Sequence, residues 1–130
     1  MNIISWNVRG LGRPSKRFLV KDFLLLHHVD IVCLQESKLS LIGPATWRSI
    51  GGPKLDKFAF TPACGSAGAM IIGWNSNLVE GLLLSQGTFC LSVKFRTKSD
   101  DTKWICTSVY GPNARHLKAD FWNEIRSCCP

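Results

Sequence analysis

The first two apolar runs of the chain give the clearest structural prediction. Two segments, 2–8 and 30–36, each have the pattern of a short buried strand. Near the carboxyl end of each lies a side chain that carries oxygen, Asn7 in the first and Glu36 in the second. The amphipathic segment from Lys16 to His28 separates them. A strand, helix and strand in this order form a right-handed crossover with parallel strands, whose carboxyl ends share one edge of the sheet. The pattern therefore predicts that Asn7 and Glu36 meet in space.

The predicted helix has a wide apolar stripe, as expected of a helix that lies on a sheet. The stripe consists of Phe18, Leu19, Val20, Phe23, Leu24, Leu25 and Leu26. Lys16, Arg17, Lys21 and Asp22 occupy the opposite side. The helix closes on His27 and His28, which we interpret as cations at the helix carboxyl end rather than metal ligands, because their charge complements the helix dipole.

More strands and a terminal helix are expected after Glu36. The predicted strands are Lys57–Thr61, Ala69–Trp74, Leu78–Ser85, Thr88–Arg96 and Lys103–Tyr110. The turns at 75–77, 86–87 and 99–101 are short enough to predict antiparallel neighbours. The pattern of residues 37–53 is too weak to assign; a short helix around 44–48 is one interpretation, and the sequence leaves the segment open. Helical periodicity resumes from 115 to 127. The whole pattern predicts a mixed α/β (α+β) fold.

The charge of the chain favours a polyanionic partner. Lys and Arg exceed Asp and Glu by 16 to 9, which gives a net charge of +7 and a pI near 9.4. A basic cluster follows Asn7 directly and consists of Arg9, Arg13, Lys16, Arg17 and Lys21. A phosphate backbone that approached this strand end would meet these residues. A solvated loop and helix face is the alternative interpretation, and the sequence leaves both open.

The cysteines and the hydropathy of the chain argue against a disulfide-bonded secreted protein and against a membrane-spanning one. No secretory signal precedes the 6 cysteines, and Cys33, Cys90 and Cys106 lie in apolar strand patterns, so we expect reduced, buried thiols. The sequence contains no Cys-x-x-Cys pair, so a zinc site built from thiolates is not expected. The uncharged segment from Phe58 to Val79 is interrupted by proline, glycine and asparagine, so we expect no transmembrane helix and a nuclear or cytoplasmic location.

Glu36 is the sharpest candidate for chemistry. A charge that closes an apolar strand must be solvated, paired or bound to a cation, and the neighbouring Asn7 favours a hard cation. Tyr110 also closes a strand, where its hydroxyl is able to donate to a phosphate or simply packs. Asn113 follows a Gly-Pro turn and either contacts phosphate or caps the next helix.

The motifs together resemble the endonuclease/exonuclease/phosphatase superfamily. They occur in the expected order and spacing as Ile4-Ser5-Trp6-Asn7-Val8-Arg9-Gly10, Leu34-Gln35-Glu36-Ser37-Lys38, Ser66-Ala67-Gly68-Ala69 and Val109-Tyr110-Gly111-Pro112-Asn113. The chain is most similar to the endonuclease domain at the start of the LINE-type (non-LTR) retrotransposon polyprotein of plants. The resemblance covers the whole chain.

The resemblance implies a four-layer sandwich of two packed sheets flanked by helices, acting as a divalent-metal phosphodiesterase on DNA. Asn7 and Glu36 would belong to a Mg²⁺ site, with Mn²⁺ as a substitute, and Glu36 would be a direct, catalytic ligand. Tyr110 would be the second catalytic residue and hold the scissile phosphate. Asn113 would contact the substrate backbone. Arg9 is expected to bind substrate as well, on the separate ground that it belongs to the basic cluster.

The chain departs from the family pattern at its end. Family members continue into an Asp-x-Asn strand and finish with an Asp-His pair, whereas this sequence ends at Cys129-Pro130. We therefore expect residues 1–130 to be a partial domain. Loss of a positioned base costs roughly 10²- to 10⁴-fold in rate, so the chain should be weak or inactive alone. An uncovered sheet is expected to favour self-association or binding of the missing half in trans.

Other functions remain open at this stage. A non-catalytic basic module would bind nucleic acid through Arg9, Arg13, Lys16 and Arg17 and cleave nothing. A relic open reading frame would have no selected role. Within the enzyme class, a phosphatase acting on inositol phosphates or lipids would share the Asn and Glu motifs.

Overall fold

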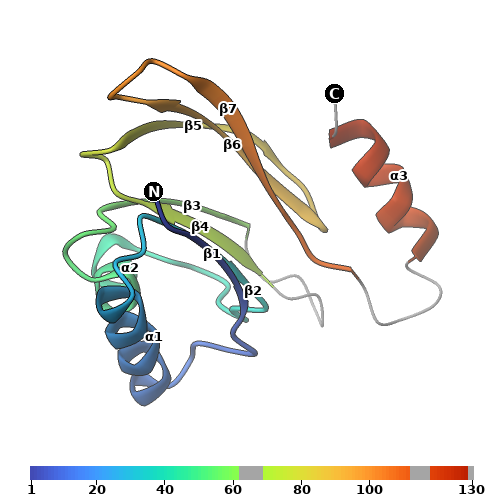
Figure 1. Ribbon diagram of the computed structural model, residues 1–130. Coiled ribbons are helices and arrows are strands. Elements are labelled where there is room, and N and C mark those ends of the chain that lie inside the picture. Colours follow the sequence, from blue (N-terminus) through green and yellow to red (C-terminus); the bar gives the residue numbers. More distant parts are fainter. Residues whose placement is uncertain (62–68, 112–117, 129–130) are drawn as a thin grey trace.

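The computed structural model describes residues 1–61, 69–111 and 118–128 (Figure 1). The elements in chain order are β1 (Ile3–Asn7), α1 (Pro14–Leu26), β2 (Ile31–Gln35), α2 (Pro44–Gly51), β3 (Lys57–Thr61), β4 (Met70–Trp74), β5 (Val79–Gln86), β6 (Cys90–Thr97), β7 (Lys103–Val109) and α3 (Lys118–Cys128). Each predicted strand and helix is present, with ends that differ by a few residues. The mixed fold of sheets flanked by helices is confirmed.

The first sheet has the strand order β1-β2-β4-β3. β1 and β2 are parallel, as the crossover predicts, and Asn7 lies opposite Gln35 in their register. β4 is antiparallel to both β2 and β3. Helices α1 and α2 cover one face of this sheet (Figure 1). β1 is an edge strand, and its Ile3 side chain is 49% exposed.

β5, β6 and β7 form a separate antiparallel sheet, and this corrects one expectation. The short turn at 75–77 predicts that β4 and β5 pair, but they lie in different sheets. β4 is already flanked by β2 and β3, so neither of its edges is open to β5. The turn, closed by the Leu78 N–H donating to the Asn75 carbonyl at 3.1 Å, instead carries the chain to the second sheet.

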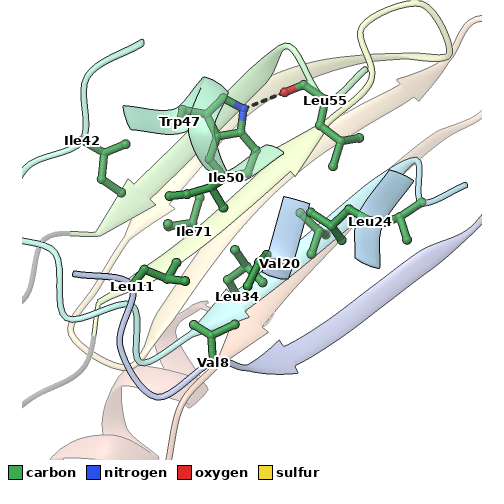
Figure 2. Close-up of a cluster of buried hydrophobic side chains, with 12 residues drawn as sticks. Val8, Leu11, Val20, Leu24, Leu34, Ile42, Trp47, Ile50, Leu55 and Ile71 are labelled. Carbon is green, nitrogen blue, oxygen red and sulfur yellow. Dashed lines mark hydrogen bonds between the residues drawn. The ribbon is translucent and has the colours of Figure 1, made fainter. Parts of the chain in front are cut away.

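The two faces of the first sheet bury different cores. On the α1 and α2 side, the helix-side core consists of Val8, Leu11, Val20, Leu24, Val29, Val32, Leu34, Ile42, Trp47, Ile50, Leu55 and Ile71 (Figure 2). Between the sheets, the inter-sheet core consists of Ile31, Cys33, Ala59, Met70, Ile72, Trp74, Val79, Leu91, Val93 and Phe95. Because β2 contributes to both, all its residues are buried.

A tryptophan and a glycine fit together in the helix-side core. The Trp47 indole N–H donates to the Leu55 carbonyl at 2.6 Å (Figure 2). A Cβ added to Gly73 of β4 would lie 2.1 Å from the Trp47 ring. A glycine in this central strand therefore makes room for the indole to pack against the sheet.

The apolar stripe predicted for α1 is only partly buried. Val20 and Leu24, spaced by one turn, reach the core, and Phe23 is half-buried. Phe18 and Leu26 are 60% and 69% exposed, and Leu19 and Leu25 are exposed as well. The prediction that the whole stripe lies on the sheet is wrong, because a helix on a flat sheet buries only the positions that face it.

Helix α3 lies beside the turn between β5 and β6. The Glu124 carboxylate accepts hydrogen bonds from the backbone N–H groups of Thr88 at 2.7 Å and Phe89 at 2.6 Å. Phe121 packs edge-on against Phe89 with ring centroids 5.6 Å apart. Within the described ranges, no helix is long and apolar enough to cross a membrane.

Candidate metal and phosphate site

The carboxyl ends of β1 and β2 stay paired beyond the last residues of the strands. The Val8 N–H donates to the Gln35 carbonyl at 3.0 Å, and the Gly10 N–H donates to the Glu36 carbonyl at 2.6 Å. Val8 is buried in the helix-side core and anchors this segment. The structure thus brings Asn7 and Glu36 to the same edge of the sheet, as the sequence predicts.

The backbone at this edge adopts an uncommon conformation on both strands. Arg9, Glu36 and Lys38 have φ angles of 53°, 56° and 57°, in the left-handed region that non-glycine residues rarely adopt. Each such residue costs on the order of 1 kcal/mol or more, and such residues concentrate at functional sites. Around Glu36, the flanking Gln35 and Ser37 are buried while Glu36 itself stays half-exposed.

Tyr110 reaches this edge from the second sheet. Its backbone N–H donates to the Phe89 carbonyl at 2.9 Å, which fixes the residue directly after β7. Its hydroxyl donates to Oε1 of Glu36 at 2.8 Å. This hydrogen bond, with a smaller effect of burial, raises the pKa of Tyr110 above its ordinary value. The phenol therefore keeps its proton and remains a donor near neutral pH.

These residues line an open cleft of about 520 Å³, which we call the site cleft. Its lining consists of Asn7, Arg9, Gln35, Glu36, Lys38, Val109, Tyr110 and Gly111. A second cleft of about 510 Å³ adjoins it, and we call it the basic cleft. It is lined by Arg9, Gly10, Gly12, Arg13, Lys16 and Lys38. Because the two share Arg9 and Lys38, a continuous cationic surface leads into the site cleft.

Gln35 is a site residue that the sequence reasoning missed. Its side chain is buried between the sheets, where the amide nitrogen donates to the hydroxyls of Ser5 at 2.9 Å and Ser108 at 3.0 Å. The amide thereby joins β1, β2 and β7 beneath the site cleft. A polar residue that interrupts an apolar strand just before Glu36 was the available signal, because a buried amide needs partners.

The donor set fits a weakly held hard cation. Glu36 makes no ion pair within the described part of the chain, and Asn7 supplies an amide oxygen that accepts the Arg9 N–H at 3.2 Å. In residues 1–61, 69–111 and 118–128, no three His, Cys, Asp or Glu side chains gather as metal ligands. One carboxylate and one amide suit Mg²⁺, which commonly keeps several waters and binds through one or two carboxylates plus substrate phosphates.

One expected site residue and most of one motif fall outside the part of the chain that the structure describes. Asn113 lies outside the described residues, as does most of the glycine turn at 66–69. Arg9 does line the cleft, next to Asn7. The structure therefore brings Asn7, Arg9, Glu36 and Tyr110 together.

Two packed sheets flanked by helices, with polar side chains gathered at the carboxyl ends of parallel strands, define the class as an α/β sandwich with an edge site. The particular family follows from comparison. The model of the Endonuclease/Exonuclease/phosphatase family matches residues 4–124, and the chain belongs to this family.

Solved structures agree on the fold. The AP endonuclease LMAP from Leishmania major is 20% identical with a TM-score of 0.58, over 85% of this chain and 40% of that protein. The APE2 catalytic domain from Xenopus laevis is 18% identical with a TM-score of 0.60, over 95% of this chain and 49% of that one. The chain thus spans less than half the length of either structure. No curated protein matches the sequence.

Proposed function

We propose that this chain carries the metal- and phosphate-binding part of a Mg²⁺-dependent phosphodiesterase that cleaves DNA. The observation that carries the proposal is the convergence of Asn7, Glu36 and Tyr110 in one polar cleft beside a basic one. Members of the family generally depend on a divalent metal. The motif resemblance to plant LINE-type retrotransposons favours a DNA nickase, acting in the nucleus or cytoplasm.

Each side chain has a defined task in this proposal. Glu36 and Asn7 hold Mg²⁺ or Mn²⁺, which supplies charge stabilisation at the scissile phosphate when bound. The Tyr110 hydroxyl donates to a phosphate oxygen, and its raised pKa keeps that proton in place. Arg9 and the basic cleft hold the flanking phosphates. The family resemblance adds Asn113 as a contact with the DNA backbone.

We further propose that residues 1–130 form a partial domain that is weak or inactive alone. The described lining of the site cleft contains Glu36 as its one carboxylate and includes no histidine to act as a base. β1 and β7 are edge strands of their sheets, with exposed apolar side chains such as Ile3 and Ile105. These edges would accept the rest of a longer domain in trans, or promote self-association.

Nicking of supercoiled plasmid in Mg²⁺ or Mn²⁺ tests the proposed activity. Weak nicking that is lost on Glu36→Gln and unaffected by Glu80→Gln is expected, because Glu80 is an exposed glutamate that pairs with Arg96 away from the cleft. Where nicking is too slow to detect, Mn²⁺ binding measured by electron paramagnetic resonance should show the same difference between the two variants. Equal Mn²⁺ binding by both would refute the metal site.

The basic cleft supports a second candidate, a non-catalytic module that binds nucleic acid. In that case DNA binding survives Glu36→Gln but weakens on replacement of Arg13 and Lys16, and its dependence on salt becomes shallower. Assays of the same protein in Mg²⁺, with an inositol phosphate and with DNA as substrates, distinguish a phosphatase from a DNA nuclease. Faster release of phosphate than nicking would favour the phosphatase.

A further inference from the structure

Two cysteine side chains face each other across the interface between the sheets. Sγ of Cys33 in β2 lies 3.6 Å from Sγ of Cys106 in β7, and both thiols are free. The two residues are 73 positions apart in the chain, so only the packing of the sheets brings them together. Since a disulfide bond measures about 2.05 Å, closure requires the sulfurs to approach by roughly 1.5 Å.

The pair belongs to a row of contacts that joins β2 to β7. Two residues further along both strands, the Gln35 amide donates to the Ser108 hydroxyl at 3.0 Å, and next the Tyr110 hydroxyl donates to Glu36 at 2.8 Å. β2 and β7 therefore face each other from different sheets and run in the same direction. This register places the two sulfurs opposite each other.

The two thiols are chemically unequal. Cys33 is 5% exposed, whereas Cys106 is partly exposed on the edge strand of its sheet. The hydrogen bond between them lowers the pKa of Cys106 and, together with burial, raises the pKa of Cys33. Its greater exposure and lowered pKa make Cys106 the more reactive thiol of the two.

We propose that Cys33 and Cys106 form a reversible disulfide that fastens the two sheets together beneath the site cleft. With glutathione disulfide as the oxidant, the Cys106 thiolate attacks one sulfur, breaks the S–S bond and releases one glutathione thiolate. Cys33 then loses its proton and attacks Sγ of Cys106, which releases the second. The protein loses two electrons and two protons, and glutathione disulfide becomes two glutathione molecules. This redox site does not depend on the proposed function.

Peptide mapping after equilibration with glutathione buffers tests the proposal. The protein carries Cys64→Ser, Cys128→Ser and Cys129→Ser, so that Cys90 is the remaining competitor. We expect a linked peptide containing Cys33 and Cys106, which reverts to free thiols when reduced glutathione is restored. The melting temperature should rise on oxidation, because the link constrains a long loop of the unfolded chain. Cys106→Ala and Cys106→Ser should each abolish both effects.

The rate of closure separates folded geometry from chance pairing. Closure should be at least about tenfold faster in buffer than in denaturing urea, because the folded chain holds the sulfurs in place. Equal rates in both conditions would overturn the proposal. So would a link to Cys90, thiols that stay free, or a link that leaves the melting temperature unchanged.

Discussion

A carboxylate lies at each end of β2, and the two differ in their burial and in their partners. At the start of the strand, Asp30 is buried and paired, with Lys54 Nζ at 3.0 Å and the Asn2 N–H at 2.8 Å. At the other end, Glu36 accepts the Tyr110 hydroxyl and has no cationic partner within the described residues. The fold therefore neutralises the charge of Asp30 with its own groups and leaves that of Glu36 facing a cleft.

The largest difference between the two carboxylates should appear in metal binding. Glu36→Gln is expected to weaken Mn²⁺ binding by roughly 10²-fold, because it removes the one carboxylate among the described residues that line the site cleft. Asp30→Asn is the matched control. It should leave the Mn²⁺ affinity unchanged, because Asp30 pairs with Lys54 at the opposite end of β2 from Glu36. Titration calorimetry measures both. Equal losses in the two variants would show that the carboxylates do not differ as described.

Gln35 tests whether the inter-sheet interface positions the Glu36 end. Gln35→Leu leaves the hydroxyls of Ser5 and Ser108 without their donor and should lower the free energy of unfolding by about 1–3 kcal/mol. Gln86→Leu is the control, since that exposed amide donates to the Phe60 carbonyl at the surface and should cost less. Urea denaturation measures both variants. A larger loss in Gln86→Leu would contradict the positioning role.

Asp30 gives a smaller effect that depends on pH. Burial acts to raise the pKa of Asp30, but the Asn2 N–H and Lys54 outweigh it and hold the pKa below 3.8. A carboxyl whose pKa is lowered by folding stabilises the fold above its unfolded pKa, and this stability is lost as the pH falls below about 4. The Asp30→Asn variant should lose about 1 kcal/mol at pH 7 and less than that at pH 3. Denaturation at both pH values is the measurement.

The smallest predicted effect is a shift in the pKa of Tyr110. It can be measured because Tyr110 is the only tyrosine of the chain. Its absorbance titration reports one group, whose pKa should lie above 10 in the folded protein and fall back toward it in Glu36→Gln. A group whose pKa is raised by folding stabilises the fold below its unfolded pKa, and that stability disappears as the pH rises through the folded value. Asp30→Asn should leave the titration unchanged. A shift of the same size in that variant would mean that the hydrogen bond to Glu36 is not the cause.

The order of strand, helix and strand along the sequence determined one part of the site, the placement of Asn7 beside Glu36. Apolar strands around a helical segment are enough to place Asn7 beside Glu36, because a crossover between parallel strands has one hand and directs both carboxyl ends to one edge. The same local patterns located the described strands and the helices α1 and α3, and they left α2 open. They also marked Tyr110 as the end of a strand.

Only the tertiary structure decided which surfaces meet. A three-residue turn is equally compatible with pairing β5 to β4 or passing to another sheet, and the choice depended on β4 having both edges occupied. The same stacking of sheets set Tyr110 on Glu36, Gln35 on Ser108 and Cys33 on Cys106. Such contacts join residues more than 70 positions apart, so local periodicity carries no information about them. They exist because two sheets bury their apolar faces against each other in one register.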